Sequence, residues 1–277
     1  MKVIVAKPGG FCAGVRRAVQ LAEKSLRQGR KVYSLGPLIH NPQVVERLQS
    51  QGLMVTESLA EVPDGAAVLI RSHGQGPQIF LEAERRGLEV IDGTCVLVRR
   101  AQNIAQELHR QGYQVVIIGD PKHPEVRGVL AHVPSAICLN DDADLPKLAG
   151  HSRLGIVAQT TYSPAAFQRI VDRLVSSGTA EVKTLNTICQ ATQDRQQAAL
   201  ELTSQVEVMF VLGGRHSANT ARLAELCAAQ GVSTFHLESW RQFRDAYIRG
   251  KTVAGVAAGA STPDWVIEEF VRNLAQK

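Results

Sequence analysis

The chain has 277 residues, of which 44% are hydrophobic, so it can bury the cores of two or three small domains. Its 31 basic and 26 acidic residues give a formal net charge of +5, which favours anionic ligands but forms no concentrated basic run. Aromatic residues make up only 5% and are not interleaved with basic ones, so the composition argues against nucleic-acid binding.

The N-terminus carries only four consecutive apolar residues, 3–6, before Lys7, which is far short of a signal peptide's apolar region. We therefore expect a cytoplasmic protein. No apolar run reaches the length of a membrane span, so no membrane association is expected. The five cysteines are an odd number and form no CxxC pair, which argues against a disulfide framework and favours metal binding or catalysis.

Short apolar runs alternate along the chain with helix-period segments, a pattern typical of parallel sheets with crossover helices. The sequence thus predicts an α/β fold. A strand within residues 1–10 comes first, and three similar α/β units follow at residues 11–94, 95–188 and 189–277. We expect the N-terminal strand to join the third unit.

The three units are related by an internal repeat, in which a cysteine runs directly into a helical segment. The segments are CAGVRRAVQLAEKSL from Cys12, CVLVRRAQNIAQELHRQG from Cys95 and CQATQDRQQAALELTSQ from Cys189. In the first two, a pair of arginines stands at the same offset from the cysteine. The three cysteines therefore share one place in the repeat.

In each unit the cysteine segment leads to a strand that ends in glycine and a polar turn. These stretches are VYSLGPLIHN at 32–41, VVIIGDPKHPE at 115–125 and VMFVLGGRHSAN at 208–219. Four residues after the glycine stand His40, His123 and Ser217, and six residues after it stand Pro42, Glu125 and Asn219.

A further strand follows in each unit and again ends in small polar residues. These ends carry Ser72 and His73, Thr160 and Thr161, and Ser261. Ligands of parallel sheets bind beyond the carboxyl ends of the strands, where these polar tips would lie. Three such units packed about a pseudo-threefold axis would direct three thiols and three sets of polar tips into one central cavity.

Three converging thiolates suit a soft metal, and with no fourth equivalent cysteine one coordination position would stay open. Cys138 and Cys227 lie outside the repeat, and we interpret both as small buried hydrophobic residues. His40, His73 and His123 could each be a metal ligand, a phosphate binder or an acid–base group.

The remaining polar tips form a set of hydrogen-bond donors suited to the oxygens of a phosphate or diphosphate, assisted by nearby helix N-termini. No GxxxxGK[ST] or GxGxxG motif is present, so nucleotide binding lacks its usual signals. Glu125 is an acid at a strand tip, and such a group beside a metal could deliver a proton to a leaving hydroxyl.

Nine motifs, taken in chain order, resemble those of the 4-hydroxy-3-methylbut-2-enyl diphosphate reductase family. They are GFCAGVRRAV, LIHNPQVV, RSHG, DGTC, HPEVRG, QTTYS, NTICQATQDRQ, HSANTARL and GASTPDW. The matches run from residue 9 to residue 265, nearly the whole chain.

The resemblance implies a trefoil of three α/β units around a 4Fe-4S cluster held by Cys12, Cys95 and Cys189, with one iron open to the substrate's allylic hydroxyl. It also implies that Glu125 is the proton source, with Thr160 in its relay and in contact with the substrate. The residues implied to hold the diphosphate are His40, His73, His123, Ser217, Asn219 and Ser261.

The implied reaction uses two electrons and two protons to remove the hydroxyl of an allylic diphosphate as water. It gives isopentenyl and dimethylallyl diphosphates, at the last step of the methylerythritol phosphate route to isoprenoids. The resemblance also implies an electron donor such as a ferredoxin or flavodoxin. The sequence indicates neither the donor's identity nor the oligomeric state, the product ratio or the extent of domain closure.

Two positions depart from the family pattern. Val96 stands where the family usually has proline, and Ala218 replaces a common serine beside Ser217. The first change affects the stiffness of the loop beside a predicted ligand. The second removes one hydroxyl from the predicted diphosphate site, which predicts weaker substrate binding. Both changes leave open that the chain is a relative of the family that acts on a different substrate.

Two other classes of protein fit part of the pattern. A zinc hydrolase could use three cysteines and a water, although structural zinc sites usually show closely spaced ligand pairs and none occur here. A non-catalytic diphosphate-binding or redox-sensing module could keep the cluster without turnover. Glu125 and Thr160 argue against that module, because a sensor needs no proton donor.

Overall fold

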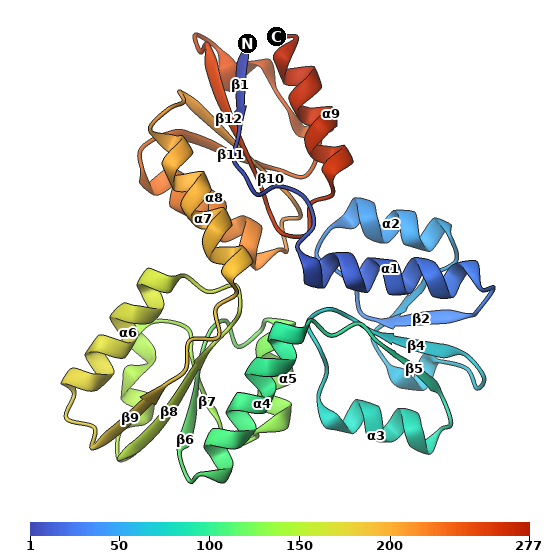
Figure 1. Ribbon diagram of the computed structural model, residues 1–277, viewed down its shortest axis with the longest axis vertical. Helices are drawn as coiled ribbons and strands as arrows, with labels where there is room; N and C mark the ends of the chain where they lie inside the picture. Colours follow the sequence, from blue (N-terminus) through green and yellow to red (C-terminus); the bar gives the residue numbers. More distant parts are fainter. The chain divides into compact units, whose positions relative to one another are not determined.

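A computed structural model describes residues 1–277, and Figure 1 shows its three four-stranded sheets. Every strand pairing is parallel, which confirms the predicted α/β class. The strand orders are β3-β2-β4-β5, β7-β6-β8-β9 and β1-β12-β10-β11. In each sheet the first strand that follows a cysteine helix in the chain (β2, β6 or β10) lies between the second and the third strands. The remaining strand (β5, β9 or β1) forms the edge beside the third, and this edge is called the fourth position.

The first sheet and its helices occupy the N-terminal third of the chain. The strands are β2 (Val32–Leu35), β3 (Met54–Thr56), β4 (Ala67–Ile70) and β5 (Glu89–Asp92), and the helices are α1 (Ala13–Arg27), α2 (Pro42–Ser50) and α3 (Pro77–Arg85). All four residues of β4 are buried, as expected of a strand covered on both faces of a parallel sheet.

The second sheet repeats this order with longer central strands. The strands are β6 (Gln114–Ile118), β7 (Ile137–Leu139), β8 (Arg153–Ala158) and β9 (Glu181–Thr184), and the helices are α4 (Val96–Arg110), α5 (Pro124–His132) and α6 (Pro164–Ser176).

The third sheet is completed by the N-terminal strand, because β1 (Lys2–Val5) pairs with β12. The other strands are β10 (Val208–Leu212), β11 (Ser233–Leu237) and β12 (Val253–Ala258), and the helices are α7 (Gln190–Thr203), α8 (Ala218–Ala229) and α9 (Asp264–Ala275). The strand β1 takes the edge position that β5 and β9 take in the other two sheets.

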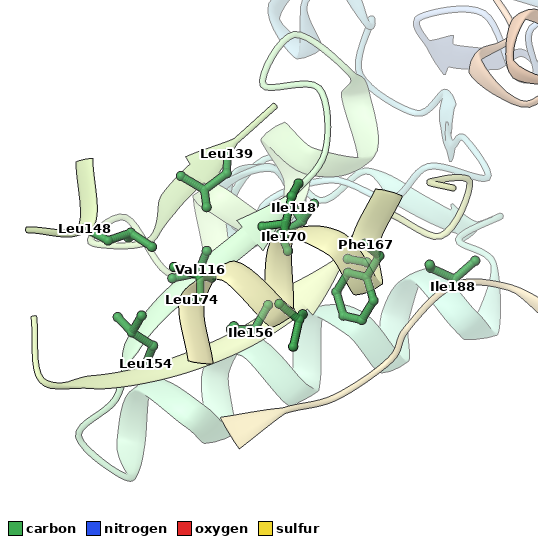
Figure 2. Close-up of a cluster of buried hydrophobic side chains, with 12 residues drawn as sticks. Val116, Ile118, Leu139, Leu148, Leu154, Ile156, Phe167, Ile170, Leu174 and Ile188 are labelled. Carbon is green, nitrogen blue, oxygen red and sulfur yellow. The ribbon is translucent and has the colours of Figure 1, made fainter. Parts of the chain in front are cut away.

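Side chains alternate across the central strands of the second sheet, so each face has its own core. Figure 2 shows one face, where residues of β6 and β8 pack against α6. The central residues of this cluster are Val116, Ile118, Ile156, Phe167, Ile170 and Leu174. On the other face, Ile117 and Val157 pack against α4 and α5. Burying such side chains contributes about 1.5 to 3 kcal/mol each and fixes the strand ends that carry polar residues.

Contacts divide the chain into two compact bodies. The smaller body comprises Met1–Arg16, Ile39–Arg47 and Gln190–Lys277, and the larger body comprises Arg17–Leu38 and Leu48–Cys189. The division into units 11–94, 95–188 and 189–277 stays a prediction. No helix combines the length and the apolar character needed to cross a membrane.

Candidate active site

The three repeated cysteines occupy the same place in the fold. Each follows the strand in the fourth position of one sheet and stands immediately before a helix: Cys12 lies between β1 and α1, Cys95 between β5 and α4, and Cys189 between β9 and α7. All three thiols are partly exposed and none forms a disulfide. Each unit therefore presents one thiol at a helix N-terminus.

The main chain holds the three cysteines in the same way. Each cysteine N–H donates to the carbonyl oxygen of the second residue after a central strand, which is β12, β4 or β8. The pairs are Cys12 to Ala260 at 3.0 Å, Cys95 to Ser72 at 3.0 Å and Cys189 to Thr160 at 2.8 Å. This recurring hydrogen bond relates the three thiols by structure as well as by sequence.

The other two cysteines have different surroundings. Burial raises the pKa of both the Cys138 and the Cys227 thiols to about 11, so neither is a ready source of thiolate. The Cys138 thiol donates to the Gly119 carbonyl at 3.3 Å. Cys227 is buried, as predicted, whereas Cys138 is only partly buried.

A buried carboxylic acid lies in the larger body. Glu125, in the first turn of α5, is 2% exposed. Thr160, just past β8, donates its N–H to Oε1 of Glu125 at 2.6 Å and its hydroxyl to Oε2 at 2.7 Å. Burial raises the pKa of Glu125 to about 7, even though both hydrogen bonds from Thr160 lower it. Near neutral pH this group therefore exchanges a proton readily.

His123 is the N-cap of α5, and its ring nitrogen Nδ1 accepts the N–H of Glu125 at 3.2 Å. Burial lowers the pKa of His123 to about 4; the charge of Asp120 opposes this change and that of Arg71 adds to it. The ring is thus neutral with its proton on Nε2, which makes Nε2 a donor. The His73 ring lies edge-on to it, with centroids 5.4 Å apart.

The smaller body holds a second group of predicted site residues. Ser217 is the N-cap of α8, and Asn219 follows in the first turn, 3% exposed. Neither polar atom of the Asn219 amide has a hydrogen-bond partner. Since a buried amide without partners is costly, Asn219 is suited to receive a ligand. The Ser261 hydroxyl donates to the main-chain oxygen of His40 at 3.3 Å, which joins those two segments.

The sequence-predicted residues therefore fall into two groups. The smaller body holds Cys12, His40, Ser217, Asn219 and Ser261, and the larger body holds His73, Cys95, His123, Glu125, Thr160 and Cys189.

The predicted alignment of the three turns is wrong by one residue in the first unit. There the helix N-cap is Asn41, whose Oδ1 accepts the N–H of Val44 at 3.1 Å, and His40 lies one residue earlier. The helices α2 and α5 both begin at a proline, which suits the first position of a helix, so the extra residue lies in the turn between Gly36 and α2.

Sequence reasoning missed two buried residues near this site. Arg195 is 4% exposed and donates to the carbonyl oxygens of Gly10 and Ala191, both at 2.9 Å, so it holds the loop before Cys12. Thr220 is fully buried beneath Ser217. Arginine and threonine are usually solvated, but both residues lie within the quoted motifs NTICQATQDRQ and HSANTARL, which is the signal that could have found them.

The departures at Val96 and Ala218 leave the local geometry in place. Val96 is the first residue of α4 with its side chain 68% exposed, and the Cys95 N–H keeps its bond to Ser72. Ala218 begins α8, directly after the Ser217 cap.

The fold and the site define a class: a parallel α/β protein with three equivalent thiols, a buried acid and capping residues that offer hydrogen-bond donors. The model of the LytB protein family matches residues 3–275. The chain belongs to the LytB protein family.

Curated relatives cover the whole chain. It is 43% identical over 280 residues to the 4-hydroxy-3-methylbut-2-enyl diphosphate reductase of Geobacter metallireducens, covering 100% of this chain and 98% of the relative. The reductase of the same name from Aquifex aeolicus is 41% identical over 279 residues, covering 99% and 96%.

Solved structures of such reductases share the fold. One, the (E)-4-hydroxy-3-methyl-but-2-enyl diphosphate reductase described as the terminal enzyme of the non-mevalonate pathway, is 40% identical, with a TM-score of 0.73 over 100% of both chains. The E-1-hydroxy-2-methyl-but-2-enyl-4-diphosphate reductase of Plasmodium falciparum is 28% identical. Its TM-score is 0.95, over 99% of this chain and 88% of that chain.

Proposed function

We propose that this chain reduces 4-hydroxy-3-methylbut-2-enyl diphosphate to isopentenyl and dimethylallyl diphosphates, the reaction that the names of its relatives point to. Two electrons and two protons convert the allylic C–OH into C–H and release the oxygen as water. The observation that carries the proposal is the equivalent placement of Cys12, Cys95 and Cys189, each fixed by the same backbone hydrogen bond.

The three cysteines would hold a 4Fe-4S cluster. Their chemistry fits, because three partly exposed thiols that form no disulfide are suitable ligands for iron and a fourth equivalent cysteine is lacking. The trefoil of three units that the resemblance implies stays a prediction. When bound, the cluster supplies the electrons and a Lewis-acidic iron for the poor leaving group.

Glu125 would supply the proton that leaves with the hydroxyl. Its pKa of about 7 keeps part of the population protonated at neutral pH without making the acid too weak to donate. Thr160 touches both carboxylate oxygens, so its hydroxyl can pass a proton between Glu125 and the substrate.

The diphosphate would be held by neutral hydrogen-bond donors. His40, His73, His123, Ser217, Asn219 and Ser261 form this set. The partnerless amide of Asn219 and the neutral His123 ring support the assignment, because an anion accepts hydrogen bonds from each. Held in this way, the allylic end of the substrate would be oriented toward the thiols.

The two nitrogens of His123 can be tested separately. An asparagine can retain the cap to Glu125 but lacks the distal donor, whereas a glutamine can place an N–H near the position of Nε2 but loses the cap. We expect His123→Asn to raise the substrate KM by about 10- to 100-fold, and His123→Gln to raise it less. Steady-state kinetics at pH 7.5 measures both, and equal KM values for the two variants would contradict the assigned tautomer.

The electrons would come from a small redox protein such as a ferredoxin or flavodoxin. A cytoplasmic location agrees with this choice of donor and stays a prediction.

The proposed function is tested by reduced-viologen oxidation with the anaerobically reconstituted protein, with and without 4-hydroxy-3-methylbut-2-enyl diphosphate. We expect substrate-dependent oxidation that Cys12→Ser abolishes and Cys138→Ser retains. A protein that loads zinc and stays colourless would favour a hydrolase instead. A loaded cluster without turnover would favour a sensor or a relative with another substrate.

A further inference from the structure

Thr220 and Ser217 share two hydrogen bonds at the start of α8. The Thr220 hydroxyl donates to the Ser217 Oγ at 3.0 Å, and the Thr220 N–H donates to the same oxygen at 3.3 Å. Thr220 is fully buried and Ser217 is 5% exposed. The Ser217 oxygen therefore accepts twice from one neighbouring residue.

These two bonds fix what Ser217 can offer to a ligand. A serine hydroxyl has two acceptor lone pairs and one proton to donate, and here both lone pairs are occupied. The Ser217 N–H is also used, because it donates to the Gly214 carbonyl at 3.0 Å. The hydroxyl proton remains, so Ser217 presents a donor and no acceptor.

Two glycines leave room for the Thr220 hydroxyl in this position. A Cβ atom at Gly213 would lie 2.7 Å from the Thr220 Oγ1, and one at Gly259 would also collide with it. Gly213 follows β10 with a φ of 144°, a conformation that favours glycine, and Gly259 follows β12. The Thr220 side chain thus fills the space that the two missing Cβ atoms leave at the strand ends.

We propose that Thr220 is a positioning residue that fixes the Ser217 hydroxyl as a donor to the diphosphate. The inference rests on the proposed function, which assigns Ser217 to the diphosphate. An anion repels a hydroxyl that turns a lone pair toward it, so fixing the polarity in advance saves the cost of reorienting Ser217 on binding. Thr220 acts through Ser217 and does not itself contact substrate.

The test uses the anaerobically reconstituted holoenzyme and compares Thr220→Val with Thr220→Ser. Valine keeps the branched shape and the N–H but removes the hydroxyl donor, whereas serine keeps the donor. We expect Thr220→Val to raise the KM for 4-hydroxy-3-methylbut-2-enyl diphosphate by about 3- to 10-fold with kcat within about twofold, and Thr220→Ser to restore the wild-type KM. A Thr220→Val variant with unchanged KM, or a Thr220→Ser variant that does not restore it, would overturn the inference.

A double-mutant cycle with Ser217→Ala separates positioning from general packing. If Thr220 acts through Ser217, Thr220→Val changes KM by less than about twofold in the Ser217→Ala background. An undiminished effect there would show a packing role and overturn the inference. Should Ser217→Ala itself leave KM unchanged, the assignment of Ser217 to the diphosphate fails. If Ser217→Ala raises KM and Thr220→Val does not, the positioning role alone fails.

Discussion

Replacing Glu125 with glutamine lowers the turnover of 4-hydroxy-3-methylbut-2-enyl diphosphate by about 10²- to 10⁴-fold, the usual contribution of a positioned proton donor. Cluster content and product affinity stay near those of the wild type, because glutamine fills the same buried space and can still accept one of the two hydrogen bonds from Thr160. Single-turnover kinetics with the reduced enzyme, alongside iron analysis, measures both effects. Glu107→Gln, on the exposed face of α4, is the matched control. Unchanged turnover in Glu125→Gln would remove Glu125 from the mechanism.

The pH dependence follows from the same carboxyl group. Because burial raises the pKa of Glu125 to about 7, the proton donor is lost and the wild-type rate falls as pH rises through about 7. The free energy of unfolding also falls as pH rises. The folded state holds the proton more tightly than an unfolded chain with a pKa near 4.5, so this contribution is complete below about pH 4.5 and is lost by about pH 7. Urea unfolding at pH 5 and pH 8 should show this loss in the wild type and not in Glu125→Gln.

We expect that replacing Cys95 or Cys189 with serine abolishes binding of the proposed iron–sulfur cluster. A serine hydroxyl is a far weaker ligand for iron than a thiolate, and each cysteine supplies one of the three proposed ligands. Iron and sulfide content, together with the visible absorbance of the anaerobically reconstituted protein, measures the loss. Cys138→Ser should keep the cluster, because its thiol lies outside the repeat and donates only to a carbonyl oxygen. Full cluster content in Cys95→Ser would contradict the proposed ligand set.

Much of the fold could be predicted from the sequence, because the information is local and repeated. Apolar runs such as Val208–Leu212 bury every side chain, and such runs indicate central parallel strands. The three cysteines could be recognised as equivalent because each stands directly before a helical segment. The repeat also pointed to the polar residues at the strand ends, such as Thr160 and Ser217.

The rest depends on contacts between distant segments, which no local pattern records. Arg195 holds the Gly10 carbonyl across 185 residues of sequence. Arg71 bears on the pKa of His123 only because the ends of β4 and β6 lie near one another. The raised pKa of Glu125 arises from complete burial, which a residue in the first turn of a helix does not reveal by its sequence.

The pairing of β1 with β12 has a consequence for how the protein is made. The strand β1 is synthesised before the first two sheets, yet its partner Val253–Ala258 is synthesised after them. The first two sheets can form during translation before β12 exists, whereas the third must wait for β12 to pair with β1. The carbonyl that fixes Cys12 belongs to Ala260, in the same late segment. A nascent chain that does not yet include Ala260 therefore lacks the hydrogen bond that fixes Cys12, so we expect binding of the proposed cluster to follow synthesis of β12.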